Sequence, residues 1–87
     1  MKFEWDDKKS LANKLKHGID FSEAVEMWKD ENRVEIKAPH PLEERSIMIG
    51  KIGKKLWTTI FAYRGDDIRI ISVRHSRKKE ILLYEEE

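Results

Sequence analysis

The sequence contains no cysteine among its 87 residues, and it has no long apolar run. A disulfide scaffold, a thiolate metal site and a thiol nucleophile are therefore excluded, which fits a reducing cytoplasm. No apolar stretch approaches the roughly 20 residues of a membrane helix, and the opening MKFEWDDKK lacks the apolar region of a signal peptide. We expect a cytoplasmic protein without membrane contact, formed by a single domain over residues 1–87.

Motifs of metal and nucleotide sites are also missing. The three histidines, His17, His40 and His75, lie far apart in the sequence, and none belongs to a ligand-spaced pair such as HExxH. The stretch from Gly50 to Gly53 is too short for a phosphate-binding Walker loop, and no GxSxG motif occurs. We therefore expect neither a metal ion nor a cofactor.

The charge is distributed unevenly along the chain. Residues 45–79 contain ten Lys/Arg and two Asp/Glu, a balance of +8, whereas the other residues contain eight and fifteen, a balance of −7. This asymmetry favours a basic face for a polyanion. An ordinary solvated surface explains the same count about equally well.

Alternation, capping residues and turn signals predict the element order β-α-α-β-β-β-β-α. We expect strands over 2–5, 33–37, 45–52, 56–63 and 68–73, and helices over 7–17, 21–29 and 76–84. This order predicts an α+β fold: an antiparallel sheet of four to five strands with two N-terminal helices and a C-terminal helix. In the first helix, Leu11 and Leu15 form a narrow apolar stripe.

The strand over 68–73 carries the first candidate side chain. Strict alternation places Arg69, Ile71 and Val73 on one face and Ile70, Ser72 and Arg74 on the other. An arginine within an apolar strand needs a partner, because a buried lone charge is costly. Arg69 is therefore predicted either to form an ion pair with an acid such as Glu4 or Asp20, or to open onto a cleft.

A basic cluster follows at the junction of this strand with the last helix. Arg74 offers a fork of donors to a phosphate, and His75 adds an imidazole, the side-chain type most often used to move protons. On the last helix, Arg77, Glu80 or Ile81, and Tyr84 fall near one face. Two of these residues also have a purely structural explanation. His75 can be a solvated residue at the start of a helix, and Tyr84 can be a half-buried packing residue.

Residues spread over nearly the whole chain then match a known family: Phe3–Asp6, Lys9, Asn13, Lys16–Ile19, Phe21, Ala24, Arg45, Arg69–Arg74, Glu80 and Tyr84. On these residues the chain resembles the BrnT toxins of bacterial type II toxin–antitoxin systems, which are small ribonucleases of the RelE-like fold. It departs from the usual family pattern at Val73, His75 and Ser76, where members usually or often carry Ala, Arg and Ala.

The resemblance implies a toxin that cleaves RNA and thereby inhibits translation. We hypothesise a metal-independent endoribonuclease in which Arg69 and Arg74 hold the scissile phosphate, His75 or Glu80 moves a proton, and Tyr84 assists. The flanking RNA backbone would be contacted by basic residues, namely Lys16, His17, Arg45, Arg64 and Arg77. The resemblance also implies a ribbon-helix-helix antitoxin (BrnA-like), with operator DNA bound only through the toxin–antitoxin complex.

The residues alone leave two other functions open. The same fold and basic face can bind RNA or DNA without cutting it. They can also dock an acidic protein segment, such as a part of the antitoxin, as a pure interaction domain. The family resemblance is what places the ribonuclease ahead of the two binding modules.

Overall fold

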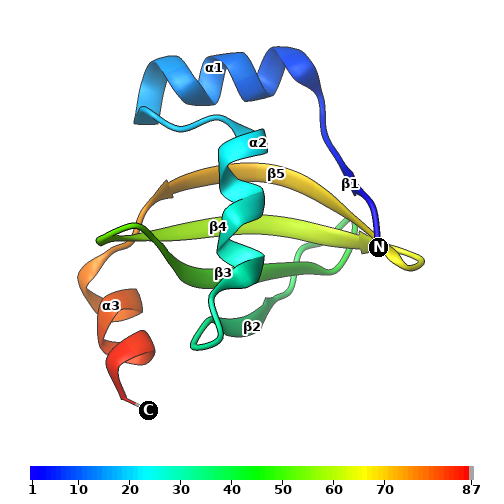
Figure 1. The fold of residues 1–87 in the computed structure, drawn as a ribbon. Helices are drawn as coiled ribbons and strands as arrows, with labels where there is room; N and C mark the ends of the chain where they lie inside the picture. The colour runs from blue at the N-terminus through cyan, green and yellow to red at the C-terminus, as the bar shows by residue number, and fades with distance from the viewer. Residues whose placement is uncertain (87) are drawn as a thin grey trace.

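The structure, a computed structural model, describes residues 1–86 and shows one five-stranded sheet with helices before and after it (Figure 1). In chain order the elements are β1 (Phe3–Glu4), α1 (Asp7–His17), α2 (Phe21–Ala24), the 3₁₀ helix η1 (Val25–Lys29), β2 (Val34–Ala38), β3 (Arg45–Ile52), β4 (Lys55–Arg64), β5 (Asp67–His75) and α3 (Lys78–Glu85). This order confirms the expected α+β fold. The predicted domain extends to residue 87, which lies outside the described residues.

The sheet has the strand order β1-β5-β4-β3-β2. Strands β2 to β5 pair antiparallel with their neighbours, as expected, whereas β1 pairs in parallel with β5 through Phe3 and Glu4. The sheet is therefore mixed but mostly antiparallel. Gly53 and Gly65 form the two hairpin turns at a φ of 62°, which glycine adopts without steric cost.

Helix α1 begins and ends as its sequence predicts. The Asp6 side chain accepts hydrogen bonds from the backbone N–H groups of Lys8 and Lys9, at 2.9 and 3.2 Å. At the other end, Gly18 has a φ of 82° and donates its N–H to the carbonyl of Lys14. These two caps satisfy backbone groups that a helix leaves without intrahelical partners.

The buried side of α1 is polar, which contradicts the apolar stripe expected from the sequence. Leu11 and Leu15 are 64% and 81% exposed, whereas Ser10 and Asn13 are buried. Asn13 donates to the carbonyls of Ile19 and Val73 and accepts from the N–H of Val73. Its side-chain amide therefore pairs with β5 much as a neighbouring strand would, and it fixes α1 along the edge of the sheet.

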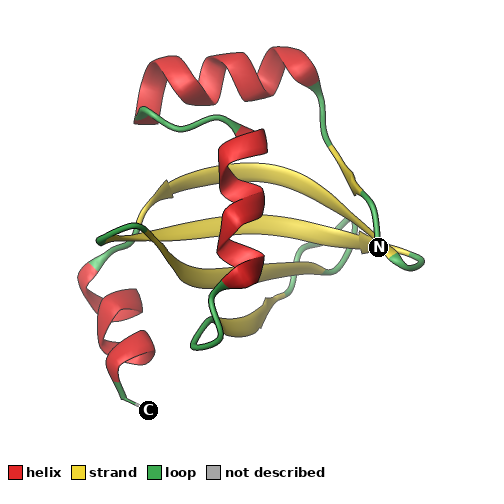
Figure 2. Cartoon of the chain, in the orientation of Figure 1, coloured by secondary structure: helices red, strands yellow, loops and turns green. Residues whose placement is uncertain are grey.

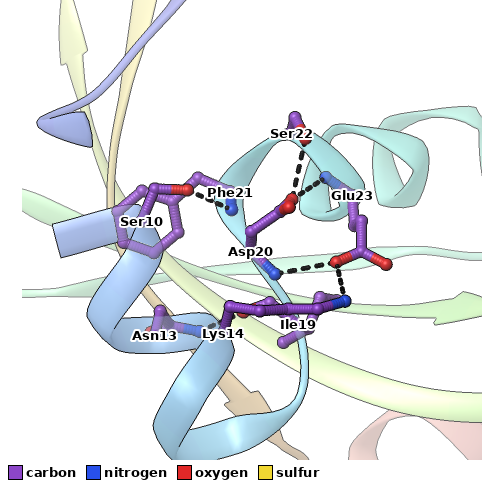
Figure 3. Close-up of polar contacts among 8 residues, drawn as sticks. All are labelled: Ser10, Asn13, Lys14, Ile19, Asp20, Phe21, Ser22 and Glu23. Carbon is purple, nitrogen blue, oxygen red and sulfur yellow. Dashed lines mark hydrogen bonds and ion pairs between the residues drawn. The ribbon is translucent and has the colours of Figure 1, made fainter. Parts of the chain in front are cut away.

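A compact polar corner joins α1 to α2 (Figure 3). Ser10 Oγ accepts from the Phe21 N–H at 2.9 Å, and Asp20 accepts from the Glu23 N–H at 2.8 Å. The Glu23 carboxylate in turn accepts from the Asp20 N–H and from Lys14 Nζ, completing a capping box with an ion pair. These bonds set the angle at which α2 leaves α1.

The second helix changes type halfway. The α-helix expected over 21–29 is four residues of α-helix, α2, followed by the 3₁₀ helix η1. Together they cross one face of the sheet (Figure 2). There Trp28 lies edge-on against Phe61 at 5.2 Å, and Thr59 Oγ1 donates to Met27 Sδ at 3.0 Å. This face holds the main hydrophobic core.

The opposite face of the sheet, which we call the open face, is turned away from α1, α2 and η1. Cross-strand pairs such as Ile47–Ile60 and Thr58–Arg74 define which side chains lie on it. Helix α3 covers one end of the open face, where its Glu80 contacts Thr58 and Arg74. The residues of β3, β4 and β5 on the open face include Arg45, Ile47, Ile49, Thr58, Ile60, Ala62, Arg64, Arg69, Ser72 and Arg74.

Candidate functional site

A β-bulge in β5 decides which side chains share the open face. Ile60 pairs with Ser72 and Phe61 pairs with Ile70, so that Ile71 has no partner on β4. One extra residue on a strand shifts the alternation of its side chains by one position. Every residue of β5 after Ile71 therefore points to the face opposite to the one that strict alternation predicts.

The bulge brings the two arginines of β5 to the same face. Strict alternation predicts Arg69 with Val73 and separates both from Arg74, and this prediction is wrong. Arg69 pairs with Ala62 and Arg74 pairs with Thr58, which lie on one side of β4. Val73 points into the core instead and is fully buried. The spacing along β4 separates the two arginines by about 13 Å.

Arg74 is held firmly by a carboxylate from α3. Its Nη1 and Nη2 donate to Glu80 Oε1 and Oε2, both at 2.8 Å. The two side chains are only 19% and 14% exposed. Bidentate pairing of this kind is stronger and more directional than a single contact, and partial burial reduces screening by water.

Three further groups complete the surroundings of Glu80. Its Oε1 accepts from Thr58 Oγ1 at 3.0 Å and from the Arg77 N–H at 2.7 Å. Because the Thr58 hydroxyl has one proton, which it gives to Glu80, Ser76 Oγ donates to Thr58 across their 2.8 Å contact. The hydrogen bonds from Arg74 are the largest cause that lowers the pKa of Glu80 to about 2; burial opposes them, and the bonds from Arg77 and Thr58 add smaller lowering contributions. Glu80 is thus a bound anion, poorly suited to accept a proton at neutral pH.

Two N–H donors of the Arg74 guanidinium are available to a ligand. Of its five N–H donors, two bind Glu80 and a third, on Nη1, points to the carbonyl of His75 at 3.3 Å. Within residues 1–86 the Nε–H and the second N–H on Nη2 have no protein acceptor. These two donors form the side fork of the group, which matches two oxygens of a phosphate.

Arg69 lies at the other end of the open face in a weaker pair. Its Nη1 contacts Glu4 Oε2 at 3.2 Å, and the side chains are 33% and 45% exposed. The ion pair expected with Glu4 is therefore present, and the alternative partner Asp20 is not used. A single contact at this exposure is worth little and exchanges readily with solvent.

Arg45 and Arg64 extend the basic surface toward the loop before β3. Both lie near Glu43, with N–O distances of 3.9 and 3.5 Å. Arg45 Nε is buried and has no hydrogen-bond acceptor among the described residues. The pocket beside them, of about 390 Å³, is lined by acids and bases together, including Glu35 and Lys37. Its mixed charge makes it a poorer anion site than the Arg74 end.

His75 does not act beside Arg74 in the way that their adjacency suggests. Consecutive residues of a strand point to opposite faces, and His75 pairs across the strand with Trp57 on the helix-covered side. Its ring stacks on Trp57 at 4.0 Å with 27° between the planes. Trp57 itself is buried in the core.

The remaining predicted residues lie apart from Arg74. Tyr84 is half-buried and donates its hydroxyl to Asp30 Oδ2 at 2.8 Å, which ties α3 to the turn after η1. Arg77 is the exposed residue at the start of α3, where only its backbone N–H reaches Glu80. Lys16 and His17 lie at the end of α1, in a groove beside β5.

Sequence reasoning missed Thr58 as a member of the group of side chains around Glu80, although a buried threonine in an apolar strand is a signal for a polar partner.

In the described part of the chain, no three His, Cys, Asp or Glu side chains lie close enough to hold a metal ion. None of the helices within residues 1–86 is long and apolar enough to cross a membrane.

Comparison with known proteins adds one finding to this geometry. A family model described as the ribonuclease toxin BrnT of type II toxin–antitoxin systems matches residues 5–80. The match includes β5, Arg69, Arg74 and Glu80 and ends at the first turn of α3. No individually curated protein matches the chain.

Proposed function

The chain belongs to the BrnT family of ribonuclease toxins of type II toxin–antitoxin systems, and on that premise we propose that it cleaves RNA without a metal ion. The 2′-oxygen of the substrate attacks the adjacent phosphorus as its proton passes to water, and the bond from phosphorus to the 5′-oxygen of the next nucleotide breaks. The leaving oxygen takes a proton from water, so the products are a 2′,3′-cyclic phosphate and a 5′-hydroxyl, and the need for a 2′-hydroxyl restricts cleavage to RNA. One observation carries this proposal: Arg74 is fixed by Glu80 on the open face with its side fork of donors unoccupied by protein.

Arg74 binds the scissile phosphate and stabilises the charge that develops on it. The carboxylate of Glu80 holds the guanidinium in place before substrate arrives, so that little reorganisation is needed during the reaction. The Thr58 hydroxyl and the Arg77 N–H hold Glu80 in turn. Glu80 is therefore a positioning residue for Arg74, and its low pKa argues against the role of general base.

The other arginines of the open face contact the backbone on one side of the scissile bond. Arg69 is the nearest on β5, and it can exchange its exposed Glu4 partner for a phosphate. Arg45 and Arg64 lie on the neighbouring strands at the same end of the face. Arg77 provides an exposed cation at the other end, beside α3.

Protein side chains are less well placed to transfer protons in this mechanism than the sequence suggested. His75 is the remaining candidate, but its ring lies on the face opposite to Arg74, against Trp57. The Tyr84 hydroxyl is bound to Asp30. The arrangement supports catalysis that depends mainly on in-line orientation of the RNA and on charge stabilisation by Arg74.

The first test is a cleavage assay with the full chain in EDTA. A structured RNA and a DNA of the same sequence are incubated separately, and the ends of the products are identified. We expect cutting of the RNA only, with 2′,3′-cyclic phosphate ends. Cutting of DNA, or a requirement for added metal, would overturn the mechanism. Binding of both nucleic acids without products would favour the non-catalytic binding module.

The role of Arg74 is tested in the same assay. Arg74→Ala should slow cleavage by about 10²–10³-fold, the usual cost of removing one donor that stabilises a developing anion. Arg74→Lys should recover little, because an ammonium lacks the fork. Arg33→Ala is the matched control, since Arg33 is exposed and lies outside the open face. Unchanged cleavage by folded Arg74→Ala would remove Arg74 from the mechanism.

A type II toxin has an antitoxin protein as its partner. We propose that this partner is a ribbon-helix-helix protein, and that operator DNA is bound only by the complex of the two. Mixing the chain with the candidate antitoxin and operator DNA tests this. Binding of the operator by the toxin alone would contradict it.

A further inference from the structure

A second basic site lies off the open face, in a groove between α1 and β5. The groove has a volume of about 240 Å³, and its walls include Lys9, Asn13, Lys16 and His17 on one side and Ile71 and Ser72 on the other. It follows the outer edge of β5 beyond the short pairing with β1, which reaches only Arg69.

The bulge and Asn13 together create this groove. Asn13 pairs with the backbone of Val73 and holds α1 against the edge of β5. Just before Val73, the extra residue Ile71 interrupts the pairing with β4 and bends the strand. The space between the bent edge and the helix is the groove, so its shape is set by buried, hydrogen-bonded groups.

The charges in the groove differ from those elsewhere on the surface. Lys9, Lys16 and His17 line it together, and no acidic residue does. Their side chains have no ion pair or hydrogen bond within residues 1–86. By contrast, Lys14 on the other side of the same helix is bound to Glu23 at 2.7 Å. Three basic side chains therefore converge on one groove with nothing to neutralise them.

Helix electrostatics explain only part of this pattern. Lys16 and His17 lie in the last turn of α1, where the helix dipole favours cations. Lys9 lies in the first turn, where the dipole disfavours a cation, so its position has no such explanation. Lys9 and Lys16 are seven residues apart, two turns on one side of the helix, or about 10 Å.

We propose that this groove binds the phosphate backbone of a nucleic-acid strand that continues from the open face around the edge of β5. Ser72 belongs to both surfaces, because its side chain lies on the open face between Arg69 and Arg74 and the same residue is part of the lining of the groove. Phosphates bind the lysines as point charges, so the groove accepts RNA and DNA alike. The groove can bind a strand whether or not the chain cleaves RNA. Only the statement that the bound strand is the substrate rests on the proposed ribonuclease function.

Salt-dependent binding of a short single-stranded DNA oligonucleotide tests the groove without requiring cleavage. Lys9→Ala and Lys16→Ala should each weaken binding several-fold at about 0.1 M salt and lower the slope of log K against log salt by about 0.7. Lys8→Ala is the matched control, because Lys8 is an exposed neighbour on the same helix that does not line the groove. It should leave the slope unchanged.

The outcomes separate this inference from the proposed function. Lower slopes for Lys9→Ala and Lys16→Ala support the groove even if the wild-type chain cuts no RNA. Equal effects of Lys8→Ala and Lys9→Ala would overturn it, because the whole helix would then act as a diffuse charge. Unchanged salt slopes in Lys9→Ala and Lys16→Ala would also overturn the inference. If these variants lose antitoxin binding while DNA binding is unchanged, the inference is again overturned, and the groove binds an acidic protein segment instead.

Discussion

The two arginines of β5 both pair with a glutamate, yet the two pairs differ in exposure, geometry and surroundings. Arg74 and Glu80 are less than one-fifth exposed and meet through two contacts of 2.8 Å, with further donors on Glu80. Arg69 and Glu4 are one-third and nearly one-half exposed and meet through one contact of 3.2 Å. The first pair is fixed before a ligand arrives, whereas the second can open.

The difference indicates what each end of the strand is suited to do. A guanidinium that keeps its position and retains a free fork is prepared for the charge of a transition state. A guanidinium with an exchangeable partner is suited to binding, because a phosphate replaces the carboxylate at little net cost. Removing the glutamate should therefore have opposite effects at the two ends: a slower reaction at Glu80 and tighter binding at Glu4.

Of the two glutamates, Glu80 is expected to show the larger effect, in the variant Glu80→Gln. The amide keeps the shape of the side chain but turns a donor toward Arg74, so the guanidinium loses its fixed position. Misplacement of a catalytic group by about 1 Å costs on the order of 10²-fold, and we expect a loss of about 10–10²-fold in the single-turnover rate at saturating RNA. The pH dependence of that rate should keep its shape. Loss of its acidic limb would identify Glu80 as a proton carrier instead.

The same pair makes stability depend on pH. The pKa of Glu80 is lowered from 4.5 to about 2 in the folded protein, so its contribution is complete above pH 4.5 and is lost as the pH falls toward 2. Because each pKa unit corresponds to about 1.36 kcal/mol, the contribution of the ionised Glu80 to the free energy of unfolding is about 3 kcal/mol at most. Urea unfolding at pH 7 and pH 3 should show a smaller difference for Glu80→Gln than for the wild type. Glu26→Gln, on the exposed side of η1, is the control. If Glu80→Gln and Glu26→Gln reduce the stability difference between pH 7 and pH 3 equally, the pH dependence does not come from the Arg74–Glu80 pair.

Most of the fold could be predicted because its signals are local. Asp6 and Gly18 delimit α1, Asp20 starts α2, and Gly65 turns the hairpin between β4 and β5, each by a backbone requirement that its residue type satisfies. The polar underside of α1 could not be predicted in this way. Asn13 is buried because it pairs with Val73, which is sixty residues away.

The arrangement of the site depended on a feature that the sequence conceals. The stretch from Ile68 to Val73 is almost continuously apolar, so its pattern gives no sign that Ile71 interrupts the alternation. Arg69 and Arg74 were correctly expected to be near a strand, but their common face follows only from the bulge. Ordinary alternation, and not the bulge, turns His75 away from Arg74, which adjacency in the sequence had suggested as its partner.

The smallest effect, and the one of opposite sign, is expected for Glu4→Gln. Exposed ion pairs are worth about 0.2–1 kcal/mol, so releasing Arg69 should tighten RNA binding by at most about fivefold and leave the stability nearly unchanged. Filter binding in the cleavage buffer, with the Arg74→Ala background to prevent turnover, measures the affinity. Glu31→Gln removes the same charge from an exposed turn away from β5 and serves as the control. If Glu31→Gln tightens binding equally, net charge is the cause; if Glu4→Gln weakens binding, Glu4 positions Arg69 as Glu80 positions Arg74, and the two ends of β5 work alike.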